Sequence, residues 1–160
     1  MPVIEYVEDR MESEELLERL CPPVRNWFKD KFPDFTEPQK VAIPRILNGE
    51  HLLLCSPTGS GKTLTAFLTI IDDLVRRSLD GSLPDAVQCV YISPIKALAN
   101  DIEKNLMGPL GEIKERYLPS RAKEIKVGLR TGDTPQSERE KMLRKPPHIL
   151  ITTPESLGLG

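Results

Sequence analysis

The sequence predicts an α/β fold in which helices flank a parallel β-sheet, with a short helical segment ahead of it. Two observations predict this fold. From residue 51 onward, short apolar runs alternate with amphipathic stretches that have helical spacing. The connections between the apolar runs are also long enough to hold a crossover helix, which strands need if they are to lie parallel in one sheet.

Residues 1–31 are expected to form a helical segment of their own, ahead of a main domain that takes in residues 32–160. Apolar residues at helical spacing predict one helix over 13–20 and another over 23–31. Cys21-Pro22-Pro23 separates the two, because a residue before proline is turned away from helical geometry.

A third helix is expected between Thr36, which can cap its start, and Asn48-Gly49, which can end it. The side chains expected to face inward from it are Val41, Ile43, Ile46 and Leu47. Apolar runs then predict strands at 51–55, 87–93, 126–130 and 148–152. Helices are predicted between them at 62–79, from about 96 to a break at Gly108-Pro109, and at 135–144.

The composition is that of one soluble domain and gives no general attraction for nucleic acid. The 160 residues are 39% hydrophobic and carry a formal net charge of −2, so contact with a polynucleotide must use a local surface. No apolar run approaches the ~20 residues that cross a bilayer, and the acidic N-terminus is unlike a signal peptide. The scattered cysteines Cys21, Cys55 and Cys89 are interpreted as buried thiols in a reducing, cytoplasmic setting.

The stretch SPTGSGKT at 56–63 has the residues of a phosphate-binding loop between an expected strand and an expected helix. The general pattern G-x-x-x-x-G-K-[ST] begins with glycine, whereas this stretch begins with Ser56. Its glycines let main-chain N–H groups turn toward one point above the positive end of the next helix. Lys62 and Thr63 are the candidate catalytic residues: Lys62 would reach the β- and γ-phosphates, and the Thr63 hydroxyl would ligate Mg²⁺. The alternative is a glycine-rich surface turn with an ordinary lysine.

Four other segments accompany this loop and carry a resemblance to a known family. They are FPDFTEPQKVAIP at 32–44, PIKALAND at 94–101, RTGDT at 130–134 and ITTPESL at 151–157. In this order they resemble the Q motif, motif Ia, motif Ib and the next nucleic-acid-contacting motif of superfamily 2 ATP-dependent helicases. The segments ISPIKALAND, RTGDTPQSER and KPPHILITTPESL are especially similar to the corresponding sequences of the large helicase-related (Lhr-type) family. The resemblance implies the N-terminal part of a first RecA-like motor domain, which is a P-loop NTPase fold.

The resemblance also implies roles for residues outside the phosphate loop. Gln39 would pair with N6 and N7 of adenine and so select ATP, although from the residues alone a solvent-facing helix glutamine is the alternative. The residues expected to contact ATP are Gln39, Pro57, Thr58, Gly59, Ser60, Gly61, Lys62, Thr63 and Leu64.

A second set of residues follows the predicted strands and is expected to contact nucleic acid at the carboxyl edge of the sheet. The set is Pro94, Lys96, Ala97, Asn100, Arg130, Thr131, Gly132, Thr152, Thr153 and Glu155. Ordinary capping at the strand–helix junctions is the alternative for each of them taken singly. The expected partner is single-stranded or partly duplex nucleic acid, with DNA favoured over RNA.

The sequence departs from the helicase pattern in one respect. It contains no D-E-x-H box, whose carboxylates would hold Mg²⁺ and position the attacking water, and no second motor domain. We therefore expect an incomplete motor domain with an unpaired sheet edge, from an ATP-hydrolysing helicase, that does not hydrolyse ATP by itself. Two alternatives remain open, namely a truncated non-catalytic nucleic-acid-binding module and a small P-loop nucleotide kinase.

Overall fold

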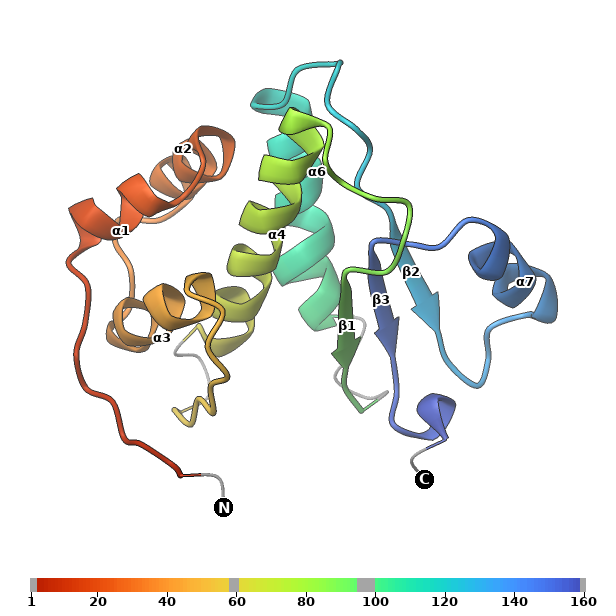
Figure 1. Ribbon diagram of the computed structural model, residues 1–160, viewed down its shortest axis with the longest axis horizontal. Helices are drawn as coiled ribbons and strands as arrows, with labels where there is room; N and C mark the ends of the chain where they lie inside the picture. The colour runs from red at the N-terminus through yellow and green to blue at the C-terminus, as the bar shows by residue number, and fades with distance from the viewer. Residues whose placement is uncertain (1–2, 58–60, 95–99, 159–160) are drawn as a thin grey trace.

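A long helix, α4 (Lys62–Asp80), forms the centre of the molecule, with helices on one side and a sheet on the other (Figure 1). The computed structural model describes residues 3–57, 61–94 and 100–158. Phe67 and Ile71 are fully buried on the core face of α4. The helix ends at Gly81, whose φ of +81° is a left-handed geometry that glycine adopts without strain. The helix predicted at 62–79 is confirmed.

Three helices from the first part of the chain lie on one side of α4 (Figure 1): the second and third pack against α4, and the first packs against the third. They are α1 (Ser13–Arg19), α2 (Pro22–Lys31) and α3 (Glu37–Leu47), as predicted. Leu16, Leu20 and Val24 belong to the same hydrophobic core as Phe67 of α4. The helices within residues 1–31 therefore share a core with the rest of the chain, and a division at residue 31 stays a prediction.

The inward face of α3 differs from the predicted one. Ile43 is fully buried as expected, and Ala42 beside it is 1% exposed, whereas Val41, Ile46 and Leu47 are only half-buried. Helix α3 packs against α4, and its buried residues Ala42 and Ile43 lie three and four positions after buried Gln39, on one narrow face of the helix.

The sheet has three described strands, β1 (Cys89–Ile92), β2 (Val127–Arg130) and β3 (Ile149–Thr152). Their order is β1-β3-β2 and both pairs are parallel, with Leu150 opposite Val90 on one side and Gly128 on the other. Central β3 is the most deeply buried strand of the three, since an inner strand has neighbours at both edges. The predicted parallel sheet is confirmed, and its strands follow the runs at 87–93, 126–130 and 148–152.

The strand predicted at 51–55 is wrong within the described part of the chain. This segment pairs with none of the three strands, and Leu53 is 82% exposed. A cavity of about 460 Å³, lined by Leu52, Leu54 and Tyr91 of β1, separates the segment from the sheet. An apolar run becomes a strand only when a neighbouring strand takes up its hydrogen bonds, and none does so here. Cys55 in this segment is exposed, so the prediction of three buried thiols is wrong for it.

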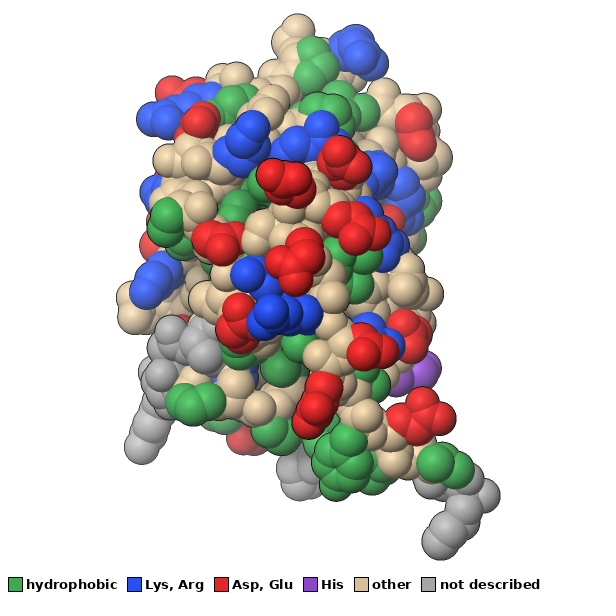
Figure 2. Space-filling model, turned by 90° about the vertical axis from the view of Figure 1, so that its left-hand side faces the viewer, with side chains coloured by type: hydrophobic (Ala, Val, Ile, Leu, Met, Phe, Trp, Pro, Cys, Tyr) green, Lys and Arg blue, Asp and Glu red, His purple; other side chains and the backbone are tan. Residues whose placement is uncertain are grey.

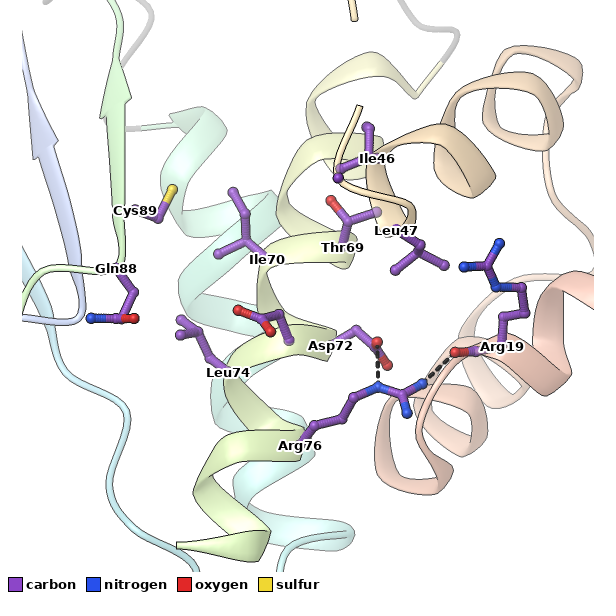
Figure 3. Close-up of a pocket in the computed structure, with 12 residues that line it drawn as sticks. Arg19, Ile46, Leu47, Thr69, Ile70, Asp72, Leu74, Arg76, Gln88 and Cys89 are labelled. Atoms are coloured by element: carbon purple, nitrogen blue, oxygen red, sulfur yellow. Dashed lines mark hydrogen bonds and ion pairs between the residues drawn. The ribbon is translucent and has the colours of Figure 1, made fainter. Parts of the chain in front are cut away.

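A second hollow, of about 570 Å³, lies along the outer edge of β1 (Figure 3). Figure 3 shows Ile46 and Leu47 of α3 on one side of it and Cys89 of β1 on the other, with Ile70 of α4 between them. Among the described strands, β1 has a neighbour only on its β3 side. The same holds for β2 on the other side of β3, so the outer edges of β1 and β2 are both unpaired among the described strands.

The helix break predicted at Gly108-Pro109 is also wrong. A π-helical turn, η1 (Glu103–Met107), leads directly into α6 (Gly108–Arg116), which lies behind α4 in Figure 1. Pro109 falls in the first turn of α6, where a missing N–H costs little, and the π turn takes up the change of register. Helix α7 (Gln136–Arg144) confirms the prediction at 135–144, and the 3₁₀ turn η2 (Glu155–Leu157) follows β3. None of the described helices has the length and apolar character to cross a membrane.

Candidate nucleotide site and nucleic-acid surface

A cavity of about 860 Å³ opens at the N-terminus of α4, between that end and helices α2, α3 and α6. It gathers five of the residues predicted to contact ATP: Gln39, Gly61, Lys62, Thr63 and Leu64. Thr58, Gly59 and Ser60 lie outside the described residues, and Pro57 is exposed just before them. The N-terminus of a 19-residue helix offers partial positive charge to an anion, so the cavity suits the phosphates of a nucleotide.

Gly61 and Lys62 set the geometry where the loop enters α4. Gly61 is the N-cap residue of α4 with φ +84°, so the chain turns into the helix through a left-handed residue. The Lys62 ammonium donates a hydrogen bond to the main-chain oxygen of Ser56, which places this charge across the loop. Thr63 follows in the first turn and is half-buried on the cavity wall. This ammonium and hydroxyl could contact a triphosphate and its Mg²⁺.

Gln39 is buried, with 3% of its surface exposed, so the alternative of a solvent-facing glutamine is wrong. Its Oε1 accepts from the Thr36 amide at 2.9 Å, and the Thr36 hydroxyl accepts from the Gln39 amide, which completes a capping box. Its Nε2 donates to the Gly61 carbonyl at 3.5 Å. The side chain thus joins the start of α3 to the start of α4, and adenine recognition by Gln39 stays a prediction.

The far wall of the cavity comes from residues that the sequence patterns did not single out for the site. Trp27 Nε1 donates to Glu112 of α6 at 2.9 Å, and Lys31 Nζ lies 3.1 Å from the same carboxylate. These two hydrogen bonds, that from Trp27 first, hold the pKa of Glu112 below its usual value. Of the two phenylalanines in the motif at 32–44, Phe32 also lines the cavity, whereas Phe35 stacks on Phe28 in the core at 4.1 Å between ring centroids.

The predicted nucleic-acid residues meet in part at the carboxyl edge of the sheet. Thr152 Oγ1 donates to the Arg130 carbonyl at 2.7 Å, which joins the ends of β3 and β2. Thr152 and Thr153 are 1% and 3% exposed, and the Thr153 hydroxyl donates to Ser156 Oγ at 3.1 Å in the turn that follows. Gly132 and Glu155 are exposed beyond them. Thr131 is buried, and Pro94 is exposed after β1.

The remaining members of that set lie elsewhere. Asn100 lines the nucleotide cavity together with Gln39 and Lys62. Lys96 and Ala97 lie outside the described residues. The helical residues from Asn100 onward therefore form part of the wall of the nucleotide cavity.

The face built by the N-terminal helices shows acidic and basic side chains side by side (Figure 2). In α3, Glu37 lies 2.6 Å from Arg10 and 3.5 Å from Lys40. A polynucleotide needs a surface of mainly positive charge, and this face does not provide one. Within the described ranges no cluster of three or more His, Cys, Asp or Glu side chains could hold a metal by itself.

Comparison with known proteins gives a consistent result. A family model described as DEAD/DEAH box helicase matches residues 36–159. The ATP-dependent helicase Lhr-Core of Methanocaldococcus jannaschii is 49% identical over 159 residues, which cover 98% of this chain and 19% of that protein. The Lhr helicase/uracil glycosylase of Escherichia coli is 44% identical over 144 residues, which cover 86% of this chain and 9% of that protein. The chain thus spans about a fifth or less of the length of these relatives.

Solved structures agree with the sequence comparison. The helicase Lhr of Mycobacterium smegmatis, bound to ssDNA and AMP-PNP, superposes with a TM-score of 0.74 at 44% identity, covering 89% of this chain and 18% of that one. The DEAD-box helicase Mss116, bound to ssRNA and UDP-BeF, superposes with a TM-score of 0.68 at 24% identity. The superposed region covers 96% of this chain and 30% of the Mss116 chain, and a sequence identity of 24% supports only the likeness of fold.

Proposed function

This chain belongs to the DEAD/DEAH box helicase family, with the RecA-like fold of its motor domains, and from that premise we propose that it binds ATP and single-stranded nucleic acid as part of an ATP-dependent helicase. The observation that carries the proposal is the convergence of Gln39, Gly61, Lys62 and Thr63 on one cavity at the start of α4. A helicase couples a nucleotide site to a strand-binding surface, and family membership displaces the nucleotide-kinase alternative.

The ATP phosphates would rest at the N-terminus of α4. The Lys62 ammonium would leave the Ser56 carbonyl and pair with the β- and γ-phosphates, which hold a stronger negative charge than a carbonyl. The Thr63 hydroxyl would be the protein's ligand for Mg²⁺, which neutralises phosphate charge. These residues bind and orient the triphosphate, and residues 1–160 hold no D-E-x-H box to activate water.

The base would lie deeper in the same cavity. One N–H of Gln39 Nε2 donates to the Gly61 carbonyl, and Oε1 accepts from the Thr36 N–H. The second N–H of Nε2 and the second lone pair of Oε1 are the groups that would pair with adenine. Phe32 lines this part of the cavity and offers an aromatic surface to the base. This arrangement supports a preference for ATP over GTP.

The strand would run along the carboxyl edge of the sheet, over the exposed Gly132 and Glu155 region. DNA is favoured because the Lhr helicase of Mycobacterium smegmatis, 44% identical to this chain, holds ssDNA in its solved structure. Contacts to sugar and phosphate from such an edge carry little base specificity.

Titration with a fluorescent ATP analogue and Mg²⁺ tests the nucleotide site. The unaltered chain should bind the analogue, and Lys62→Ala should lose most of that affinity because it removes the only ammonium placed over the loop among the described residues. Lys29→Ala is the matched control, since Lys29 is exposed on α2 and does not line the cavity. Equal affinities of the unaltered chain and Lys62→Ala for the ATP analogue would contradict the proposed nucleotide site.

A further inference from the structure

Arg139 of α7 holds together the turn at 131–134, which follows β2. Its Nη2 donates to the Thr131 carbonyl at 2.9 Å and to the Gly132 carbonyl at 3.5 Å. Its Nε donates to the Thr134 carbonyl at 3.1 Å. One planar guanidinium therefore draws three main-chain oxygens of this turn toward α7.

Two contacts set the direction of the Gly132 amide, because the Thr131 carbonyl accepts from Arg139 Nη2 and, at 3.2 Å, from the Thr134 N–H. The structure has no cis peptide bond among its described residues, and in a trans peptide the N–H points opposite to the C=O of the preceding residue. Because the Thr131 carbonyl faces Arg139, the Gly132 N–H must face away from α7.

The other amides at the start of the turn are already used. The Thr131 N–H donates to Thr134 Oγ1 at 2.8 Å, and the Asp133 N–H donates to Thr131 Oγ1 at 3.3 Å. Among the described residues, no group accepts the Gly132 N–H, and Gly132 is exposed. The turn thus presents one outward N–H donor to a ligand.

The fold itself does not require a glycine at this position. Gly132 is not among the residues with positive φ, and a Cβ placed there would meet nothing within 4 Å. A glycine that neither backbone geometry nor packing demands suits the close approach of a ligand to the main chain.

We propose that Arg139 is a positioning residue for nucleic-acid binding: by holding the carbonyls of the 131–134 turn, it aims the Gly132 N–H at a phosphate oxygen of the bound strand. This inference rests on the proposed function. Arg139 itself need not touch the strand, because its Nε and Nη2 groups already donate to the turn. Lysine could keep the charge but could not reproduce the planar three-carbonyl contact.

The test measures binding of a short fluorescein-labelled oligothymidylate to the 160-residue chain by anisotropy, at two salt concentrations. We expect Arg139→Lys to weaken binding about 5-fold to 10-fold although the charge is kept, the scale of one ordinary hydrogen bond. The dependence on salt should be unchanged, because no cationic contact to phosphate is lost. Arg144→Lys, at an exposed site on the same helix, should leave binding unaltered.

A second variant distinguishes a loss of strand binding from a loss of stability. Gly132→Ala fits the backbone and should not lower the urea midpoint, but its methyl group should crowd the phosphate and weaken binding. If both residues serve one contact, the double variant should bind about as weakly as the weaker single variant.

The outcomes distinguish the two proposals. Strand binding by the unaltered chain with no loss in Arg139→Lys would overturn the role of Arg139 alone. Full additivity of the two substitutions would also overturn it. No strand binding by the unaltered chain would overturn the nucleic-acid function together with this inference.

Discussion

The main-chain N–H of Cys21 donates a 2.6 Å hydrogen bond to Oδ1 of Asp72, a residue 51 positions later in the sequence. Cys21 precedes the first turn of α2, and Asp72 is buried in the middle of α4. The second carboxylate oxygen accepts from Arg76 at 2.9 Å, and Arg76 also donates to the Arg19 carbonyl (Figure 3). Asp72 therefore fastens the junction of α1 and α2 to the central helix.

Asp72→Ala is expected to destabilise the chain by about 1–3 kcal/mol, because it leaves the buried Cys21 N–H without an acceptor. Urea unfolding followed by circular dichroism measures this change. Asp73→Ala is the matched control: its side chain is 60% exposed and pairs with Arg77 on the surface, so it should cost less than about 0.5 kcal/mol. Similar losses in the two variants would contradict the anchoring role of Asp72.

Gly61→Ala is expected to cost more stability than Gly81→Ala, although both positions have nearly the same φ. An L-residue is strained at φ +84° or +81°, by about 1–3 kcal/mol. Only at Gly61 would the new Cβ also lie 2.7 Å from Gln39 Nε2, while at Gly81 it meets nothing within 4 Å. The extra loss should be visible in urea unfolding and should come with weaker binding of the ATP analogue. Equal losses in the two variants would show that the Gln39 contact has no energetic weight.

Local patterns were enough to predict α4 and the parallel sheet. The apolar period of 3.6 over 62–79 reflects burial of one helix face, and this burial is a property of the segment itself. The strand prediction at 51–55 was wrong because a strand also needs a neighbouring strand to take up its hydrogen bonds, and a local apolar pattern does not show whether one is present. The π turn before Pro109 was missed for a similar reason: a proline predicts a helix break, unless the preceding turn shifts register.

Half of the nucleotide cavity could be predicted from the sequence. Gln39, Lys62 and Thr63 stand in or beside motifs whose chemistry is local. The opposite wall depends on Glu112 meeting Trp27 across 85 positions, and no periodicity or spacing reports such a contact. The threonines of ITTPESL were predicted as nucleic-acid contacts, and the residue types alone could not show that Thr152 points inward to the Arg130 carbonyl.

The three thiols are expected to react at very different rates in the native chain. Burial, followed by the nearby Asp72 carboxylate, raises the pKa of Cys21 to about 12, and burial raises the pKa of Cys89. Cys55 is exposed. Because the thiolate is the reactive form, an aromatic disulfide reagent near pH 8 should label one thiol quickly and the other two slowly. Cys55→Ser should abolish the fast phase; a fast phase that persists would place another thiol at the surface.

The stability of the chain is expected to fall as the pH drops from about 6.5 toward 5, and His148 is the cause. His148 is 1% exposed, its Nδ1 accepts from the Lys126 amide at 2.9 Å, and its Nε2 is buried with no partner among the described residues. Burial first, then the charges of Lys123 and Lys126, lower its pKa from 6.5, and Asp85 only partly opposes them.

The sign follows from this lowered pKa. Well above pH 6.5 the imidazole is neutral in both states and its protonation contributes nothing to the pH dependence. Below 6.5 the unfolded chain takes up a proton before the folded chain does, so the unfolded state gains stability until the pH passes the folded pKa. The carboxyl groups with lowered pKa act in a separate window, below their ordinary values of 3.8 and 4.5.

Urea midpoints at pH 7.5 and 5.5 measure this effect. His148→Asn keeps an oxygen that can accept from the Lys126 amide but does not titrate, so it should remove most of the difference between the two pH values. His51→Asn, at an exposed position, should keep the full difference. If His148→Asn unfolds with the same pH dependence as the unaltered chain, the proton responsible binds elsewhere, and burial of His148 carries no cost near neutral pH.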